Sequence, residues 1–136
     1  MNLSSIYLAM RLLFPDGDHV RDAQAIGLEI ARSDASPYEA ALLVETAFRE
    51  SGFDAAAVSP DGRDRCAYQL RDAPRAVLVD LRRCTEIALE RIRYSIAHCP
   101  AHPIAIYATG SCSYPAGIRL DLWRMREVRK ILQVLQ

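Results

Sequence analysis

The chain has 136 residues, the length of one domain, and its 51% hydrophobic and 25% charged residues give the usual balance of a folded globular protein. The formal net charge is +0, so the basic excess of most nucleic-acid-binding domains is missing, and we expect no nucleic acid among its partners. The apolar start, residues 1–14, is interrupted by Arg11, is too short to span a membrane and lacks the basic segment that opens a signal peptide.

The first two predicted elements are amphipathic helices. Apolar residues over 3–14 recur at helical spacing until Pro15 ends the pattern. A second apolar stripe over 20–30 follows Asp18, which is a good N-cap residue. We expect these two helices to pack against each other as a hairpin.

The best-specified helix is predicted over 37–51. Ser36 is a strong N-cap, Pro37 favours the first turn, and Glu39 stands at the offset of a capping-box partner. Gly52 follows where a left-handed C-cap residue is expected. The sequence therefore predicts both ends of this helix.

The chain changes character after this helix. Ser59-Pro60-Asp61-Gly62 is a strong turn sequence, and the stretch 66–70 is suited to a short strand. Further helices are predicted over the ranges 73–81, 85–97, 103–109 and 119–135. The expected fold class is mainly α, as a single domain over 1–136 with a small irregular or β-turn region around residues 54–70.

The chain holds four cysteines and three histidines, which are Cys66, Cys84, Cys99, Cys112, His19, His98 and His102. They include no CxxC pair and no metal-ligand spacing, so we expect no metal and no cofactor. Three full disulfide connectivities are open. We expect Cys99 and Cys112 to lie close together because they bracket the helix predicted over 103–109, with a bridge there and two buried thiols about equally favoured.

Glu50 occupies an unusual place for a glutamate. It lies in the last turn of the helix predicted over 37–51, where the negative end of the helix dipole disfavours another negative charge by up to about 1 kcal/mol. Apolar neighbours such as Phe48 and Phe53 would give it the surroundings in which a carboxyl group works as a general acid. From position alone, an exposed glutamate at a frayed helix end is the more ordinary interpretation.

One stretch of the chain resembles a known enzyme family. The run 48–54, Phe-Arg-Glu-Ser-Gly-Phe-Asp, is similar to the E-S-x-F-[DN] helix end of soluble lytic transglycosylases and goose-type lysozymes. Three further blocks follow in the family's order: 57–62 resembles its A-x-S-x-x-G turn, 69–70 its M-Q-[LI], and 105–110 its A-x-Y-N-x-G helix end. The resemblance covers about residues 38–112.

The resemblance implies a lysozyme-like domain that cleaves the peptidoglycan bond between N-acetylmuramic acid and N-acetylglucosamine. In that family the helix-end glutamate protonates the glycosidic oxygen, which implies Glu50 as the catalytic residue. It also implies that Ser59 and Gln69 line the sugar cleft and that Tyr107 hydrogen-bonds the glutamate. We add Tyr68 as a candidate for stacking on a sugar because it adjoins Gln69.

The chain departs from the family pattern in two places. The segment 65–68 stands where a glycine and a methionine are usual, and Ala108 replaces an asparagine. A lytic transglycosylase needs one glutamate, acting first as acid and then as base, and we favour this activity over hydrolysis. A hydrolase would use a second carboxylate. The candidates for it, each also explained as a turn former or cap, are Asp54, Asp61, Asp64 and Asp72.

The expected partners are peptidoglycan glycan strands. A wall-degrading enzyme without an export signal would reach its substrate as a phage lysis or virion-associated protein. The expected location is therefore a phage virion or the host periplasm and cell wall, and phage structural proteins are candidate partners. The alternative is a non-catalytic structural or peptidoglycan-binding protein that kept the scaffold while its cleft diverged.

Overall fold

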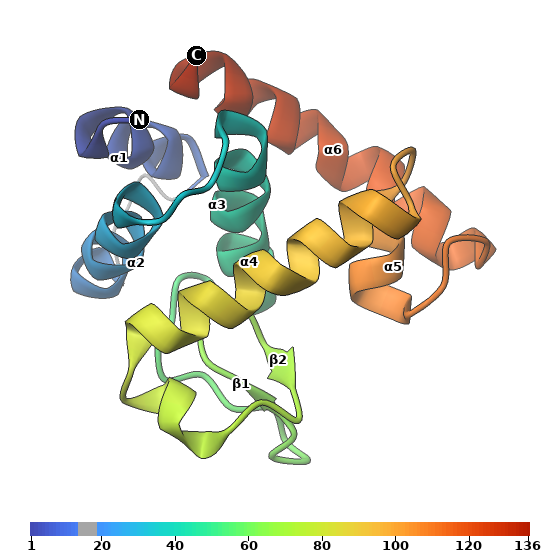
Figure 1. The fold of residues 1–136 in the computed structure, drawn as a ribbon, viewed down its shortest axis with the longest axis horizontal. Coiled ribbons are helices and arrows are strands. Elements are labelled where there is room, and N and C mark those ends of the chain that lie inside the picture. Colours follow the sequence, from blue (N-terminus) through green and yellow to red (C-terminus); the bar gives the residue numbers. More distant parts are fainter. Residues whose placement is uncertain (14–18) are drawn as a thin grey trace.

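The computed structural model describes residues 1–13 and 19–136, and it is mainly helical, as predicted (Figure 1). The helices and strands of these residues are α1 (Leu3–Leu13), α2 (Val20–Arg32), α3 (Pro37–Ser51), β1 (Asp64–Arg65), β2 (Leu70–Arg71), the 3-10 helix η1 (Arg75–Leu78), α4 (Leu81–His98), α5 (Pro103–Thr109) and α6 (Pro115–Leu135). None of the described helices has both the length and the apolar character to cross a bilayer. The helix stop expected at Pro15 and the cap expected at Asp18 lie outside the described residues.

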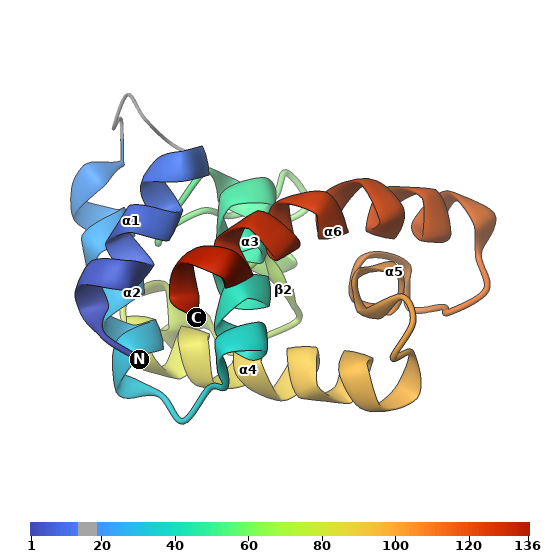
Figure 2. The ribbon, with the colours of Figure 1, turned by 90° about the horizontal axis from the view of Figure 1, so that it is seen from above.

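Helix α3 runs through the middle of the molecule. Figure 2 shows α6 on one side of it and α4 on the other, with α1 and α2 together on one flank. The expected packing of α1 against α2 is confirmed. Every residue of α3 from Ala40 to Ala47 is buried, so this stretch of the helix forms the centre of the core.

Both ends of α3 are as predicted. The Ser36 hydroxyl accepts a hydrogen bond from the Glu39 N–H at 3.2 Å, and the Glu39 carboxylate accepts one from the Ser36 N–H at 2.7 Å. Gly52 adopts the left-handed conformation with φ of 62°, and its N–H donates to the Phe48 carbonyl oxygen at 2.7 Å. These caps fix where the helix stops and therefore where Glu50 projects.

Two predicted helix starts are wrong by four residues, and one predicted helix is shorter. The segment predicted as a helix over 73–81 contains only η1. Helix α4 begins at Leu81 because the Asp80 carboxylate caps it, accepting from the Arg83 N–H at 3.0 Å. Helix α6 begins at Pro115, whose fixed φ suits the first turn of a helix.

The β region is smaller than predicted and lies elsewhere in the segment. Strands β1 and β2 pair antiparallel, with Asp64 opposite Arg71. The residues 66–69, expected to be extended, form the turn between the strands. Cys66 and Gln69 have positive φ values of 64° and 48°, which a β-strand does not allow.

The four cysteines form one disulfide and one pair of thiols. Cys66 and Cys84 are bridged, with their Cα atoms 6.5 Å apart, and the bond joins the turn of the hairpin to α4. Cys99 and Cys112 are free. Cys112 lies beside Cys99, because its thiol donates to the carbonyl oxygen of the adjacent residue, His98, at 3.3 Å. Burial and then the hydrogen bond and charge of Cys112 raise the pKa of Cys99 to about 11. The expected proximity is confirmed, and this pair is present as thiols.

Helix α5 is held against α6 by a buried carboxylate. Asp121 on α6 accepts a hydrogen bond from the Ile104 N–H at 2.9 Å and lies 3.2 Å from Nδ1 of His102. It satisfies the start of α5, which has no side-chain cap of its own. A Cβ atom at Gly117 would lie 3.0 Å from the Thr109 side chain, so the two helices approach closely.

Candidate active site

A cleft of about 690 Å³ lies between the hairpin, α4 and α5. Its lining residues are Glu50, Asp64, Gln69, Arg71, Arg91, Tyr94, Ser95, Ile106, Tyr107, Ala108, Gly110 and Leu120. Three of the five predicted site residues, Glu50, Gln69 and Tyr107, line this cleft together. Ser59 and Tyr68 do not line it.

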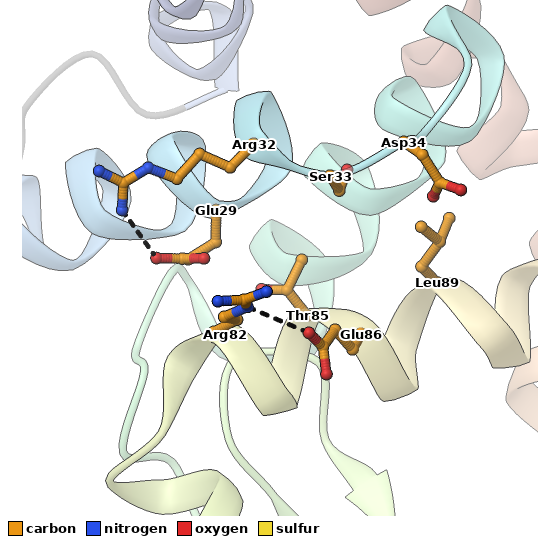
Figure 3. A pocket seen from close by; sticks show the side chains of 8 residues that line it. All are labelled: Glu29, Arg32, Ser33, Asp34, Arg82, Thr85, Glu86 and Leu89. Carbon is orange, nitrogen blue, oxygen red and sulfur yellow. Dashed lines mark hydrogen bonds and ion pairs between the residues drawn. The ribbon is translucent and has the colours of Figure 1, made fainter.

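A second hollow, of about 370 Å³, lies between α2 and α4 (Figure 3). Its walls carry both charges, including an ion pair of Glu29 with Arg32 at 3.6 Å and one of Arg82 with Glu86 at 3.2 Å. No predicted site residue lines it. The candidate active site is therefore the larger cleft.

Glu50 is held at the cleft by an arginine from α6. Its Oε1 atom accepts a hydrogen bond from Nη1 of Arg124 at 3.1 Å. The Glu50 side chain is 27% exposed, whereas Arg124 is 3% exposed and lies behind it. Apolar walls at Phe48 and Phe53 were predicted for Glu50, and the charged partner is a finding of the structure.

Arg124 is itself anchored by a second glutamate in the core. Its Nε and Nη2 atoms donate to the two carboxylate oxygens of Glu45 at 2.7 and 2.8 Å. Burial raises the pKa of Glu45, while the Arg124 hydrogen bonds act in the opposite direction. For Arg124, burial opposes the charge, but the hydrogen bonds and charges of Glu45 and Glu50 outweigh it and raise its pKa. A fixed positive charge therefore stands behind Glu50.

Tyr107 does not orient Glu50 in the way that was expected. Its hydroxyl donates to the carbonyl oxygen of Tyr68 at 2.9 Å. Burial, and then the charge of Glu50, raise the pKa of Tyr107, so this hydroxyl keeps its proton. The predicted hydrogen bond from Tyr107 to Glu50 is wrong, and Arg124 makes that contact instead.

Tyr68 is a core residue and not a sugar platform. Its side chain is 0% exposed, and burial raises the pKa of its hydroxyl. The prediction that Tyr68 stacks on a sugar is therefore wrong. The exposed aromatic ring of the cleft belongs to Tyr94 on α4, which is 57% exposed and stacks on His98 with ring centroids 3.8 Å apart.

Ser59 shapes the loop that leads into β1. Its hydroxyl donates to the Asp61 carboxylate at 2.6 Å and accepts from the Asp64 N–H at 3.0 Å. Both bonds stay within the turn, as in an ordinary hydroxyl-stabilised turn. Ser59 is not among the residues that line the cleft, and its role in sugar binding stays a prediction. Its hydrogen bond to the Asp64 N–H helps to position Asp64, which does line the cleft.

Gln69 lines the cleft with its amide nitrogen already engaged. That nitrogen donates to the carbonyl oxygens of Cys66 at 3.0 Å and Ala57 at 3.2 Å. The amide oxygen has no hydrogen-bond partner among the residues that the structure describes, and it can accept from a bound ligand. The role of Gln69 in sugar binding stays a prediction.

Two residues gain importance from the structure. Ser51 joins the end of α3 to the hairpin turn, because its hydroxyl donates to the Ala67 carbonyl oxygen at 2.8 Å and accepts from the Asp54 N–H at 3.0 Å. Ser51 belongs to the E-S-x-F run of the family resemblance, so this contact had a signal in the sequence.

Asp64 is the one candidate second carboxylate that lines the cleft, where Arg71 pairs with it at 3.3 Å.

Comparisons with known protein families, with curated proteins and with solved structures give no match for this chain. The fold and the cleft define a helical domain with a carboxylate at a helix end, a buried arginine behind it and an open space in front. Such an arrangement can deliver a proton to a bound ligand and take one back. It also brings Asp64 to the same cleft as Glu50.

Proposed function

We propose that the chain is a peptidoglycan-degrading enzyme that cleaves the bond between N-acetylmuramic acid and N-acetylglucosamine, with Glu50 as general acid and base. The observation that carries the proposal is the shared cleft of Glu50, Gln69 and Tyr107, three residues that the family resemblance named from separate blocks of sequence. Its volume of about 690 Å³ falls within the roughly 300–1,000 Å³ of ordinary ligand sites.

The surroundings of Glu50 suit a group that gives up a proton and takes it back. Glycosidic cleavage needs a proton on the leaving oxygen and a stabilised oxocarbenium-like transition state. The Arg124 guanidinium, 3.1 Å from Glu50, stabilises the carboxylate that forms when the proton leaves. A bound substrate displaces water from the cleft, so the proton passes directly from Glu50 to the glycosidic oxygen. Glu50 then accepts the proton of the attacking hydroxyl.

We favour a lytic transglycosylase over a hydrolase. In this reaction the sugar's own hydroxyl attacks, so one carboxylate is enough. Asp64, the second carboxylate of the cleft, is engaged by Arg71 at 3.3 Å, and Arg71 also lies 3.5 Å from Asp61. We assign Asp64 to substrate positioning on this basis.

Mass spectrometry of the digestion products separates the two reactions. We expect anhydro-muramyl ends, which are lighter by one water than hydrolysis products, from both the wild type and Asp64→Asn. Reducing ends from the wild type, together with loss of activity in Asp64→Asn, would show hydrolysis with Asp64 as the second carboxylate. The matched control is Asp72→Asn, because Asp72 also pairs with an arginine but does not line the cleft.

A phage virion or the host periplasm and cell wall is the proposed location, with phage structural proteins as candidate partners. The Cys66–Cys84 disulfide supports action outside a reducing cytoplasm, because disulfides persist mainly in oxidising compartments. Sedimentation of the chain with purified sacculi and with phage particles tests both partners.

A zymogram on cell-wall material tests the activity itself. We expect clearing by the wild type and at least about a hundredfold loss in Glu50→Gln, because the amide keeps the size of the side chain but cannot deliver a proton. Glu86→Gln is the matched control, since Glu86 is exposed on α4 and outside the cleft. Near-normal clearing by a folded Glu50→Gln variant would disprove the assignment.

A non-catalytic peptidoglycan-binding protein is the second candidate. Two observations favour it: Ala108 lines the cleft where the family has an asparagine, and the ion pair with Arg124 occupies the Glu50 carboxylate. This candidate predicts no clearing by the wild type and binding to sacculi that Glu50→Gln leaves unchanged.

A further inference from the structure

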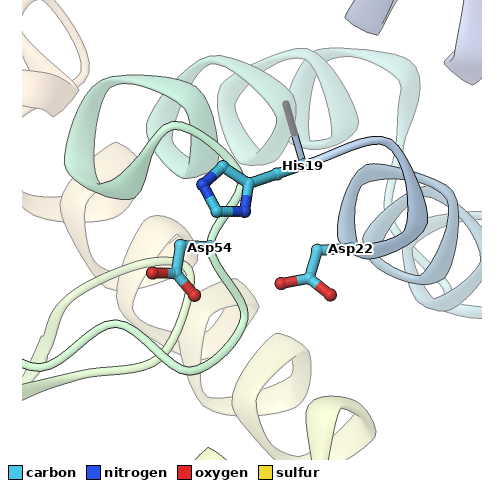
Figure 4. Close-up of side chains that lie close together, drawn as sticks. All are labelled: His19, Asp22 and Asp54. Carbon is cyan, nitrogen blue, oxygen red and sulfur yellow. The ribbon is translucent and has the colours of Figure 1, made fainter. Parts of the chain in front are cut away.

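A second group of chemistry-bearing side chains lies away from the cleft. His19 is the N-cap residue of α2, Asp22 lies in the first turn of that helix, and Asp54 follows the end of α3. Their ligand atoms all lie within 4.8 Å of one another, and Figure 4 shows the three side chains pointing toward a common space. None of them lines the cleft.

We propose that His19, Asp22 and Asp54 form a zinc site that ties the start of α2 to the loop after α3. A zinc ion binds nitrogen and oxygen ligands at about 2.0–2.2 Å, which places those ligand atoms about 3–3.5 Å apart. In the structure the ligand atoms lie within 4.8 Å of one another, so the side chains must rotate to bring them to this closer spacing when zinc binds. Three protein ligands leave a fourth position for water.

Backbone hydrogen bonds orient both carboxylates toward this space. The Asp22 Oδ2 atom accepts from the Ala55 N–H at 3.0 Å, and the Asp54 Oδ1 atom accepts from the Ala56 N–H at 3.0 Å. Each bond holds one carboxylate oxygen and leaves the other available for an ion. Such bonds to the groups that hold a metal are a usual feature of metal sites.

The charges around the group also favour a cation. Two neighbouring carboxylates repel each other unless a positive charge lies nearby. Within residues 1–13 and 19–136, no lysine or arginine forms an ion pair with Asp22 or Asp54. By contrast, Asp64 and Asp72 each pair with an arginine.

The chemical types of the three ligands indicate which metal ion the site prefers. One imidazole nitrogen and two carboxylate oxygens suit zinc and other first-row divalent ions, whereas calcium and magnesium prefer oxygen ligands alone. No metal was predicted from the sequence, because the histidines and cysteines have no metal-ligand spacing along the chain. The site instead joins two segments that only the fold brings together, and it is independent of the proposed wall-degrading activity.

Isothermal titration of the full chain with zinc chloride tests the proposal. We expect one equivalent of zinc to bind, and about a 5–10 °C rise in the unfolding temperature at roughly a hundredfold excess over Kd. His19→Ala and Asp54→Asn should each weaken binding at least about tenfold. The amide oxygen introduced by Asp54→Asn would still accept from the Ala56 N–H, so this variant is expected to fold.

Two control variants identify the binding groups. His98→Ala removes an exposed histidine on α4, and Cys112→Ser removes one of the two neighbouring thiols. Both should bind zinc as the wild type does. The proposal is overturned if the wild type binds no zinc at 100-fold molar excess over protein (about millimolar metal), or if His19→Ala and Asp54→Asn bind normally while Cys112→Ser does not.

Discussion

The two ends of α3 are built by different means. At the start, Ser36 and Glu39 close a capping box within four residues of chain, with bonds of 3.2 and 2.7 Å. At the other end, Glu50 depends on Arg124, which lies 74 residues further along the chain and which also binds Glu45. One end is set by neighbouring residues, and the other by the assembly of the whole domain.

The start of α3 is therefore fixed by local hydrogen bonds, whereas Glu50 near its end is held by a residue distant in the sequence. A capping box stabilises the helix whatever surrounds it, so its sequence signal is direct. The Glu50 carboxylate is positioned by a buried arginine, and the sequence around Glu50 gives no indication of that partner. The end of α3 that carries Glu50, the proposed catalytic residue, is therefore the end that a substitution elsewhere in the chain can damage.

The largest expected effect comes from Arg124→Met. Removing the arginine leaves Glu45 buried without its two hydrogen bonds, with only Arg49 at 4.0 Å as an ion-pair partner, and we expect a loss of about 3–5 kcal/mol in the free energy of unfolding. Wall-degrading activity should fall as well, because Glu50 loses its contact. Denaturant unfolding and the zymogram measure the two effects.

The double variant Glu45→Leu with Arg124→Met sharpens this test. An apolar pair of similar volume should recover most of the stability, while activity stays low. Full activity in the stable double variant would show that Glu50 works without Arg124, and the contrast between the two ends of α3 would be lost.

Ser36→Ala tests the other end of the helix. We expect a loss of about 1 kcal/mol in unfolding free energy, because the Glu39 N–H loses its acceptor. Activity should stay at the wild-type level under conditions where the protein is folded. A drop in activity larger than the drop in folded fraction would show that the start of α3 also affects the cleft.

Tyr107→Phe should act on both stability and activity, and weakly on each. The variant loses the 2.9 Å bond to the Tyr68 carbonyl oxygen, which should lower the unfolding free energy by about 0.5–1.5 kcal/mol. Activity should fall by a few-fold through the position of α5. A loss as large as that of Glu50→Gln would mean that the Tyr107 hydroxyl takes part in the chemistry.

The smallest expected effect is a loss of stability at acidic pH. Arg93 and then Ser36 lower the pKa of Glu39, so Glu39 adds stability above its unfolded pKa of about 4.3, and this is lost as pH falls through the lower folded value. Because the pair with Arg93 is partly exposed, we expect less than about 1 kcal/mol. Between pH 5 and 3, denaturant unfolding should show less loss in Glu39→Gln than in the wild type. Equal losses would contradict the assignment.

The contribution of Glu45 to stability should change with pH in the opposite direction. Burial raises its pKa, so its contribution to stability is fully present below the unfolded pKa and is lost as pH rises through the folded value. The start of α3, at Glu39, and its buried middle, at Glu45, therefore differ in their response to pH.

Sequence signals recovered those parts of the fold that neighbouring residues determine. The ends of α3 and α5 were predicted because Ser36, Gly52 and Gly110 act within a turn of the helix that they close. The starts of α4 and α6 lie before the predicted ones, although each carries a local signal: the Asp80 carboxylate caps α4, and Pro115 stands in the first turn of α6.

The parts of the site that the sequence did not predict depend on contacts across the fold. Tyr68 adjoins Gln69, but the positive φ values in that turn direct its ring into the core. The pairing of Cys66 with Cys84 and that of Arg124 with Glu45 join segments whose approach no spacing rule describes. Glu50, Gln69 and Tyr107 were predicted through family resemblance, which already contains such long-range information.

Helix α5, which forms one wall of the cleft, depends on Asp121, a residue of the later helix α6. Helix α5 has seven residues, and the start of this helix is satisfied by a carboxylate on α6. A helix this short is unstable alone. During synthesis, α5 lacks this cap until Asp121 has left the ribosome. The Glu50 carboxylate likewise lacks its Arg124 partner until then, so the candidate site is completed only after α6 has been made.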